Sequence, residues 1–221
     1  MRRQQEIARL LSMSVYEKTV KEQGYKIVAG VDEAGRGPLA GPVVAAACIL
    51  PEDFFLPHLN DSKLLTPTLR KQLYLKMTKR FDIFYAVGIV DSEKIDEINI
   101  LQATWLAMIK AIRSLSVKPD YVLFDGKQLP DIDIPNEGIV KGDSLSVSIA
   151  AASIIAKQTR DDLMLEYHKK YPQYGFDQHK GYGTKKHKDA IFLHGPAKIH
   201  RQSFEPIKSY LALAQLDESI F

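Results

Sequence analysis

The chain has 221 residues, of which 45% are apolar and 26% charged, a composition that excludes a largely disordered or low-complexity protein. Thirty lysines and arginines against 27 acidic residues give a net charge of +3, too small to indicate nucleic-acid binding by itself. The single cysteine, Cys48, excludes an intramolecular disulfide. No apolar run approaches the roughly 18 residues of a membrane span, and the N-terminus lacks the apolar core of a secretory signal. We therefore expect one cytoplasmic domain over residues 1–221 that contacts no membrane.

The hydrophobic pattern predicts a mixed α/β fold, with strands first and helices around and after them. A helix is predicted over residues 4–22, ending at Gly24, so that about residues 1–24 form an N-terminal helical segment. Thr66 and Pro67 suit an N-cap and a first helical position, and predict a helix to about Lys79. Strands are predicted over residues 25–31, 43–50, 83–90, 121–124 and 139–140, and further helices from residue 92, over residues 144–170 and after residue 204.

Two patterns predict how the helices pack. One is an apolar stripe at helical spacing, which we expect to face the core rather than a partner. The other is a run of alanines and isoleucines over residues 149–156, which lets a helix approach a sheet closely. The stripe consists of Leu101, Trp105, Met108 and Ile112.

Positive charge is concentrated between His168 and Arg201, where eight lysines and arginines accompany only two acids. The same stretch holds five of the six histidines and several interleaved tyrosines. Basic side chains bind phosphates and aromatic rings pack on sugars, so this composition favours a substrate-binding segment within about residues 168–221, together with C-terminal helices. A solvated surface without a ligand has the same composition, and the residues alone leave that alternative open.

Carboxylates follow three of the predicted strands: Asp32 and Glu33 after the first, Asp125 and Asp143 after the last two. One acid at a strand end is usually a turn former or a helix cap, but four at one sheet edge would repel one another and stay ionised only around cations. Two divalent ions would balance four charges, and oxygen ligands favour Mg²⁺ or Mn²⁺ over Zn²⁺. Neighbours in a regular strand point to opposite faces, so Asp32 and Glu33 can share a site only if the chain bends.

Five motifs, taken in chain order, resemble those of ribonuclease HII, the type 2 ribonuclease H. The resemblance covers about residues 25–205 and implies an RNase H-like α/β fold, with a mixed central sheet flanked by helices and a helical C-terminal segment. It also implies hydrolysis of the RNA strand of RNA–DNA hybrids, and we expect the chain to be a monomer. The motifs are Asp32-Glu33-Ala34-Gly35-Arg36-Gly37-Pro38, Asp61-Ser62-Lys63, Asp125-Gly126, Lys141-Gly142-Asp143 and His179-Lys180-Gly181-Tyr182-Gly183-Thr184.

The resemblance further implies a particular reaction. The family cuts on the 5′ side of a single ribonucleotide embedded in duplex DNA and leaves 3′-hydroxyl and 5′-phosphate ends. This activity would remove misincorporated ribonucleotides and RNA primers. We expect two divalent ions, one activating water and the other stabilising the leaving 3′ oxygen.

Residue-by-residue matching implies roles for individual side chains. Glycines at positions 35 and 37 let the backbone approach a 2′-hydroxyl, to which backbone groups can donate and from which they can accept. Asp161 lies too far along its predicted helix from Asp143 to share a metal. The matched residues are Asp32, Glu33, Asp125 and Asp143 as catalytic metal ligands, Gly35, Arg36 and Gly37 as the ribose-reading loop, Tyr182 as the ring that packs on the sugar, and Lys63 as a phosphate contact. Lys180, in the basic stretch, is a further expected substrate contact.

Other functions are weighed against this one. Residues 35–40 satisfy the G-x-G-x-x-A pattern of dinucleotide-binding oxidoreductases, but a strand rather than a helix follows them and two acids precede them. A non-catalytic module could bind hybrids through the basic stretch alone. Ribonuclease HIII is a related family, but the Gly-Arg-Gly loop and the short N-terminal segment favour HII. Residues 215–221 match no sliding-clamp motif that would support clamp binding, so we expect a frayed terminus.

Overall fold

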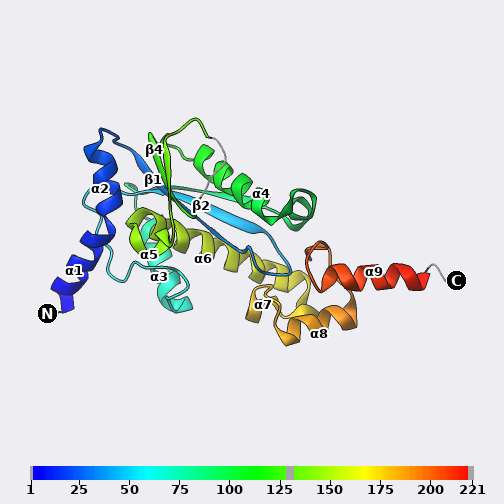
Figure 1. The fold of residues 1–221 in the computed structure, drawn as a ribbon. Coiled ribbons are helices and arrows are strands. Elements are labelled where there is room, and N and C mark those ends of the chain that lie inside the picture. The colour runs from blue at the N-terminus through cyan, green and yellow to red at the C-terminus, as the bar shows by residue number, and fades with distance from the viewer. Residues whose placement is uncertain (1, 128–131, 219–221) are drawn as a thin grey trace. The chain divides into compact units, whose positions relative to one another are not determined.

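A five-stranded mixed sheet forms the centre of the computed structural model, which describes residues 2–127 and 132–218 (Figure 1). The strand order is β3-β2-β1-β4-β5. β1 is antiparallel to β2 and parallel to β4, and β4 is parallel to β5. The predicted mixed α/β fold is therefore confirmed. The strands are β1 (Val28–Ala34), β2 (Val43–Ile49), β3 (Phe84–Val90), β4 (Tyr121–Asp125) and β5 (Asn136–Ile139).

Helices surround and follow the sheet, and none of those within the described ranges is long and apolar enough to cross a membrane. They are α1 (Arg2–Met13), α2 (Val15–Glu22), α3 (Pro67–Thr78), α4 (Ser92–Arg113), α5 (Gly142–Leu145), α6 (Val147–Lys170), a 3₁₀ turn (Pro172–Tyr174), α7 (Phe176–His179), α8 (Lys185–His194) and α9 (Ile207–Glu218).

The chain divides into two compact units. We call residues 1–34, 44–89 and 105–158 the sheet unit, and residues 35–43, 90–104 and 159–221 the helical unit. The sheet unit contains the central sheet and α1, α2, α3 and α5, and the helical unit contains α7, α8 and α9. The single domain expected over residues 1–221 stays a prediction. Residues 219–221, at the end of the tail considered for clamp binding, lie outside the described residues.

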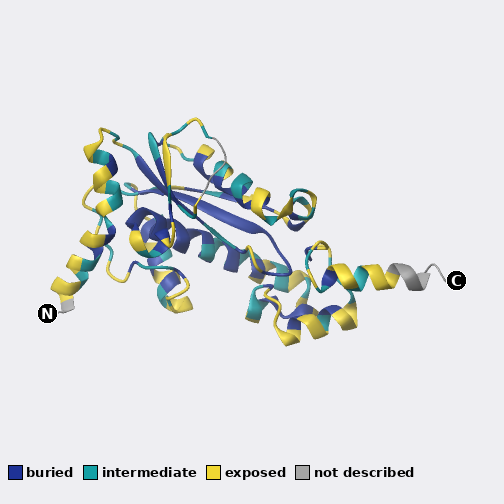
Figure 2. Ribbon diagram, viewed as in Figure 1, coloured by how far each residue is buried: buried dark blue, intermediate teal, exposed yellow. Residues whose placement is uncertain are grey.

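The core of the sheet unit is built where the small-residue run of α6 meets β1. Figure 2 shows the central strands and the N-terminal part of this helix as largely buried. A methyl group at Gly30 would lie 2.1 Å from the backbone carbonyl carbon of Ser148, so strand and helix are in contact at backbone distance. The close approach predicted from the alanine and isoleucine run is thus confirmed. Figure 1 shows α4 and α6 on opposite faces of the sheet.

Three helices differ from their predicted form. The predicted helix over residues 4–22 is two helices, broken at Ser14, whose hydroxyl donates a 2.9 Å hydrogen bond to the Leu10 carbonyl. The predicted helix over residues 144–170 breaks at Ser146, which is extended at φ −126° and ψ 132°. Within α4, Asn99 is non-helical at φ 65° and ψ 165°. In contrast, α3 begins as predicted, because the Thr66 hydroxyl accepts a hydrogen bond from the Leu69 amide.

The packing of the apolar stripe in α4 was only partly predicted. Met108 and Ile112 are buried in the sheet unit, as expected. Leu101 is 42% exposed, so its predicted core position is wrong. Trp105 is half-buried. Leu101 lies in the first turn after the break at Asn99, whereas Met108 and Ile112 lie further along the helix.

The basic stretch is not simply a solvated surface, because it contributes to the core of the helical unit. Tyr174, Phe176 and Ile191 are buried there, and Figure 2 shows buried positions between exposed ones in this region. Arg201, counted among the charges of the stretch, is fully buried. Folding therefore removes part of the predicted basic surface.

Candidate active site

Three of the four predicted carboxylates converge in the sheet unit. Asp32 lies on β1, Asp125 ends β4, and Asp143 lies in α5. β1 and β4 run parallel, so their carboxyl ends meet at one edge of the sheet. Each acid offers an oxygen, and these atoms lie within 4.8 Å of one another. Asp32 and Asp143 are buried, and Asp125 is half-buried.

Backbone amides orient two of these acids. The Glu33 amide donates a 2.7 Å hydrogen bond to Oδ1 of Asp32. The Gly142 amide, at the start of α5, donates a 2.7 Å hydrogen bond to Oδ1 of Asp125. The second oxygen of Asp32, Oδ2, is buried without a hydrogen-bond partner among the described residues. A buried carboxylate oxygen in this position needs a cation or a proton.

The electrostatics of the cluster also favour a cation. Burial raises the pKa of Asp32 well above its ordinary value, and the charges of Glu33 and Asp125 raise it further. Burial also raises the pKa of Asp125, opposed by the Gly142 amide and reinforced by Asp143. A divalent ion would relieve this repulsion. All the donors are hard oxygens, so the residues fit Mg²⁺ or Mn²⁺.

Glu33 does not belong to this group of three. β1 keeps its regular pairing with β2 from Ala29 to Ala34. The strand pairing is therefore not interrupted at Asp32 and Glu33, where a bend would be needed to bring both acids to one site. Gly30 faces α6, and side chains two residues apart share a face, so Asp32 lies on the α6 side and Glu33 on the other. Its role as a metal ligand stays a prediction. Asp161 also lies outside the group.

Lys63 lies against the carboxylates. Its Nζ is 3.3 Å from Oδ2 of Asp143. Partial burial lowers the pKa of Lys63, but Asp61, Asp143 and Asp32 together raise it above its ordinary value. The ammonium group therefore stays charged and partly neutralises the cluster. Sequence reasoning expected Lys63 at a phosphate and missed this contact with an acid.

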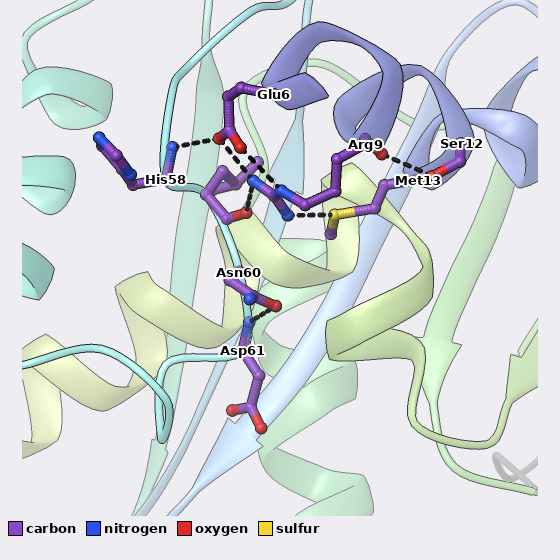
Figure 3. Close-up of polar contacts among 8 residues, drawn as sticks. Glu6, Arg9, Ser12, Met13, His58, Asn60 and Asp61 are labelled. Atoms are coloured by element: carbon purple, nitrogen blue, oxygen red, sulfur yellow. Dashed lines mark hydrogen bonds and ion pairs between the residues drawn. The ribbon is translucent and has the colours of Figure 1, made fainter. Parts of the chain in front are cut away.

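The N-terminal helix α1 anchors the loop that leads to Lys63 (Figure 3). Oε1 of Glu6 accepts a 2.7 Å hydrogen bond from the His58 amide, and Arg9 donates a 2.8 Å hydrogen bond to the Leu59 carbonyl. Glu6 and Arg9 form an ion pair with each other at 2.7 Å, and Arg9 lowers the pKa of Glu6 to about 2. The sequence predicted the helix but not its role in anchoring this loop.

The residues expected to read the ribose lie together in the helical unit. The Leu39 amide donates a 2.8 Å hydrogen bond to the Gly181 carbonyl, which joins the 35–42 loop to the Tyr182 segment. A methyl group at Gly37 would lie 3.9 Å from the Tyr182 ring. Arg36, Gly37 and Tyr182 are exposed. Their roles in binding stay predictions, as does that of Lys180, whose ammonium donates to the Asp177 carbonyl.

Sequence reasoning missed two buried arginines beside this loop. Arg201 was counted as surface charge, and Arg160 was not considered at all. A signal for Arg160 was present, because it stands at i, i+4 spacing between Ala156 and Met164, two apolar residues that α6 buries. A cation on a buried helix face is a position that needs an explanation.

Fold and site together define the class of protein. The chain is similar to the crystal structure of ribonuclease H2 from Pyrococcus horikoshii OT3, with a TM-score of 0.70 at 28% identity over 86% of this chain and 99% of that one. It is also similar to Bst-RNase HIII in complex with Mn²⁺, with a TM-score of 0.66 over 88% of this chain and 72% of that one, where 20% identity shows the fold alone. The chain is a nuclease with the RNase H-like fold, a metal-dependent class.

Sequence comparison identifies the family within this class. The family model for ribonuclease HII matches residues 29–207. Ribonuclease HII of Chlamydia pneumoniae is 52% identical over 208 residues, which cover 94% of this chain and 97% of that protein. The chain belongs to the ribonuclease HII family. This confirms the resemblance, the enzyme class and the RNase H-like fold expected from the motifs.

Proposed function

We propose that this chain hydrolyses the RNA strand of RNA–DNA hybrids and cuts 5′ of single ribonucleotides in duplex DNA. Its family acts on RNA–DNA hybrids. The observation that carries the proposal is the group of Asp32, Asp125 and Asp143, whose oxygens are close enough to share divalent ions. Removal of misincorporated ribonucleotides and RNA primers, as a monomer in the cytoplasm, follows as part of the same proposal.

The chain's own residues prepare the site for Mg²⁺ or Mn²⁺. Asp32, Asp125 and Asp143 would hold the ions, with Glu33 as the fourth ligand. Two divalent ions, when bound, would supply an activated water and stabilise the leaving 3′ oxygen. The Glu33 and Gly142 amides keep Asp32 and Asp125 oriented, and so reduce the reorganisation that binding requires. Lys63, beside Asp143, adds a positive charge that attracts the scissile phosphate.

Substrate recognition is proposed for the helical unit. The backbone of Gly35, Arg36 and Gly37, of which Arg36 and Gly37 are exposed, would read the ribose 2′-hydroxyl, and Tyr182 would pack on the sugar. The 2′-hydroxyl serves as a recognition mark and not as the nucleophile. Its reach extends only to the phosphate on its own 3′ side, so it cannot cut on the 5′ side.

A DNA duplex with one embedded ribonucleotide tests this function. We expect cleavage with Mg²⁺ and none with a chelator, and mapping of the termini should find a 3′-hydroxyl on the DNA and a 5′-phosphate on the ribonucleotide. The matched all-DNA duplex should stay intact, and Asp143→Asn should bind the substrate without cutting it. A 2′,3′-cyclic phosphate would contradict the water mechanism. Binding of hybrids without turnover by the wild-type chain would instead support a non-catalytic hybrid-binding module.

A further inference from the structure

Arg201 donates hydrogen bonds only to backbone carbonyls among the described residues. Nη2 donates to Gly35 at 2.5 Å and to Gly41 at 3.0 Å, Nη1 donates to Arg36 at 2.7 Å, and Nε donates to Gly41 at 3.1 Å. The side chain is fully buried. The guanidinium group thus binds both ends of the loop that contains the Gly-Arg-Gly sequence.

Arg160 holds the same loop from α6. Nη2 donates to the Ala40 carbonyl at 3.1 Å, Nε to the Pro42 carbonyl at 3.0 Å, and Nη1 to the Lys180 carbonyl at 3.0 Å. This side chain is also fully buried. The last of these bonds links the loop to the segment that carries Tyr182, over whose ring the guanidinium carbon lies at 5.9 Å.

Two buried cations without an ion-pair partner among the described residues are costly for stability alone. Burial, together with the charge of Arg160, lowers the pKa of Arg201 to about 9. The group is still protonated at neutral pH. Apolar side chains of similar volume would fill the same space without the desolvation cost of a charge. A role in shaping the backbone accounts for the two arginines better than packing does.

The hydrogen bonds to Arg201 determine where the neighbouring amides point. A trans peptide group is planar, and its N–H points opposite to its C=O. The carbonyls of Gly35 and Arg36 point at Arg201, so the amides of Arg36 and Gly37, which share those peptide planes, point away from it. Both residues are exposed, whereas Arg201 is fully buried. Two successive amides are therefore directed away from the interior.

We propose that Arg160 and Arg201 are positioning residues that hold the 35–42 loop in the shape that presents the Arg36 and Gly37 amides to a ribose. The inference rests on the proposed function of this loop. Gly35 fits the arrangement, because a methyl group there would lie 2.0 Å from Nε of Arg160 and the residue has a φ of +96°. A lysine could keep the charge at either position, but a single ammonium group cannot reproduce a planar fork that binds several carbonyls.

Equilibrium binding of two duplexes tests the proposal. Fluorescence anisotropy in a chelator, where no cleavage occurs, would measure the affinity for a duplex with one ribonucleotide and for the matched all-DNA duplex. The wild-type chain should prefer the first. Arg201→Lys and Arg160→Lys should reduce that preference about tenfold while leaving the affinity for the all-DNA duplex unchanged. Arg113→Lys, at an exposed arginine of the sheet unit, is the matched control and should retain the preference.

The outcomes separate the two proposals. A folded Arg201→Lys chain that keeps the full preference would overturn the positioning role and leave the proposed function intact. An equal loss of affinity for both duplexes would also overturn it, because a purely structural defect acts on all binding. A wild-type chain that does not distinguish the duplexes would instead contradict the proposed ribose reading itself.

A measurement on the wild-type chain covers the case in which the lysine variants do not fold. Amide hydrogen exchange of Arg36 and Gly37 should slow on binding the ribonucleotide-containing duplex and much less on binding the all-DNA duplex. Equal exchange rates of these amides in the two complexes would refute the proposal that the loop presents them to the ribose.

Discussion

Asp32 is a carboxylate placed for function at a cost to the stability of the metal-free chain. Its Oδ2 is buried without a hydrogen-bond partner among the described residues, and burial with two neighbouring acids raises its pKa. Such a group destabilises the folded chain at neutral pH unless a cation neutralises it. Stability and metal binding therefore make opposite demands on this position.

Replacement of Asp32 by asparagine should separate these demands. Asp32→Asn removes one charge from the cluster, so we expect Mn²⁺ affinity, measured by calorimetry, to fall by at least about tenfold. The free energy of unfolding in a chelator should rise by about 1 kcal/mol, because like-charge repulsion is relieved. Asp53→Asn, at an exposed acid of the same unit, should change neither quantity. Unchanged Mn²⁺ affinity in Asp32→Asn would show that this acid is not a ligand.

At the scale of elements, Glu17 of α2 contacts the chain at the break between α5, which bears Asp143, and α6. Oε1 of Glu17 accepts hydrogen bonds from the Ser146 hydroxyl at 2.5 Å, the Ser148 hydroxyl at 2.6 Å and the Ser148 amide at 3.0 Å. Ser146 follows α5, and its amide donates to the Gly142 carbonyl at 2.8 Å. The break between α5 and α6, which the sequence pattern did not predict, is thus held by Glu17 from another part of the chain.

Loss of this contact should affect the metal site through Asp143. In Glu17→Ala, two hydroxyls and one helix-terminal amide lose their shared acceptor, so we expect a stability loss of about 2 kcal/mol. Mn²⁺ affinity should fall by about three- to tenfold, since α5 is less well held. Thermal melting and calorimetry measure the two effects. Glu22→Ala, at an exposed position of the same helix, is the control. A stability loss with unchanged Mn²⁺ affinity would confine Glu17 to a structural role.

At the scale of the whole molecule, the interior of the helical unit depends on neutral histidines. The Ala197 amide donates to Nδ1 of His200 at 2.8 Å, the two Nε2 atoms of His200 and His187 are 3.1 Å apart, and Nδ1 of His187 is 2.9 Å from the Tyr182 carbonyl. These contacts are satisfied when both rings are neutral, with His200 donating through Nε2 and His187 through Nδ1. Nδ1 of His200 also lies 3.1 Å from the Ala197 carbonyl.

The network predicts that acid destabilises the helical unit. Burial lowers the pKa of His187 and of His200 to about 4, while both would be near 6.5 in the unfolded chain. Above pH 6.5 both states are neutral and these groups add no pH dependence. Between about pH 6.5 and 4 only the unfolded chain takes up protons at these histidines. The free energy of unfolding should therefore fall by several kcal/mol, since each pKa unit of difference between the two states is worth about 1.4 kcal/mol for each histidine.

Urea unfolding at a series of pH values, followed by Tyr or Trp fluorescence, measures this loss. His200→Gln cannot take up a proton and should flatten the profile, whereas His194→Gln, at an exposed position of α8, should leave it unchanged. A wild-type stability that is constant between pH 7 and pH 5 would contradict the assigned neutral network.

Local patterns in the sequence were sufficient to predict much of this protein. The cap at Thr66 and the alternation of strands and helices depend on residues close together in the chain, and the structure bears out both. Three of the four acids predicted at one sheet edge lie together, and Glu33 lies outside that group. The motif series was also sufficient to predict the family, because it combines residue type with order and spacing.

The tertiary structure alone decided which polar groups meet inside the molecule. Periodicity predicts which face of a helix or strand is buried, but not which group lies opposite that face. Three contacts were therefore not predictable: Lys63 with Asp143, Glu17 with the serines that follow α5, and Arg201 with the carbonyls of Gly35 and Arg36. A buried charge is stable only when distant segments supply its partners. Those partners are brought together by folding, and their separation along the chain carries no local signal.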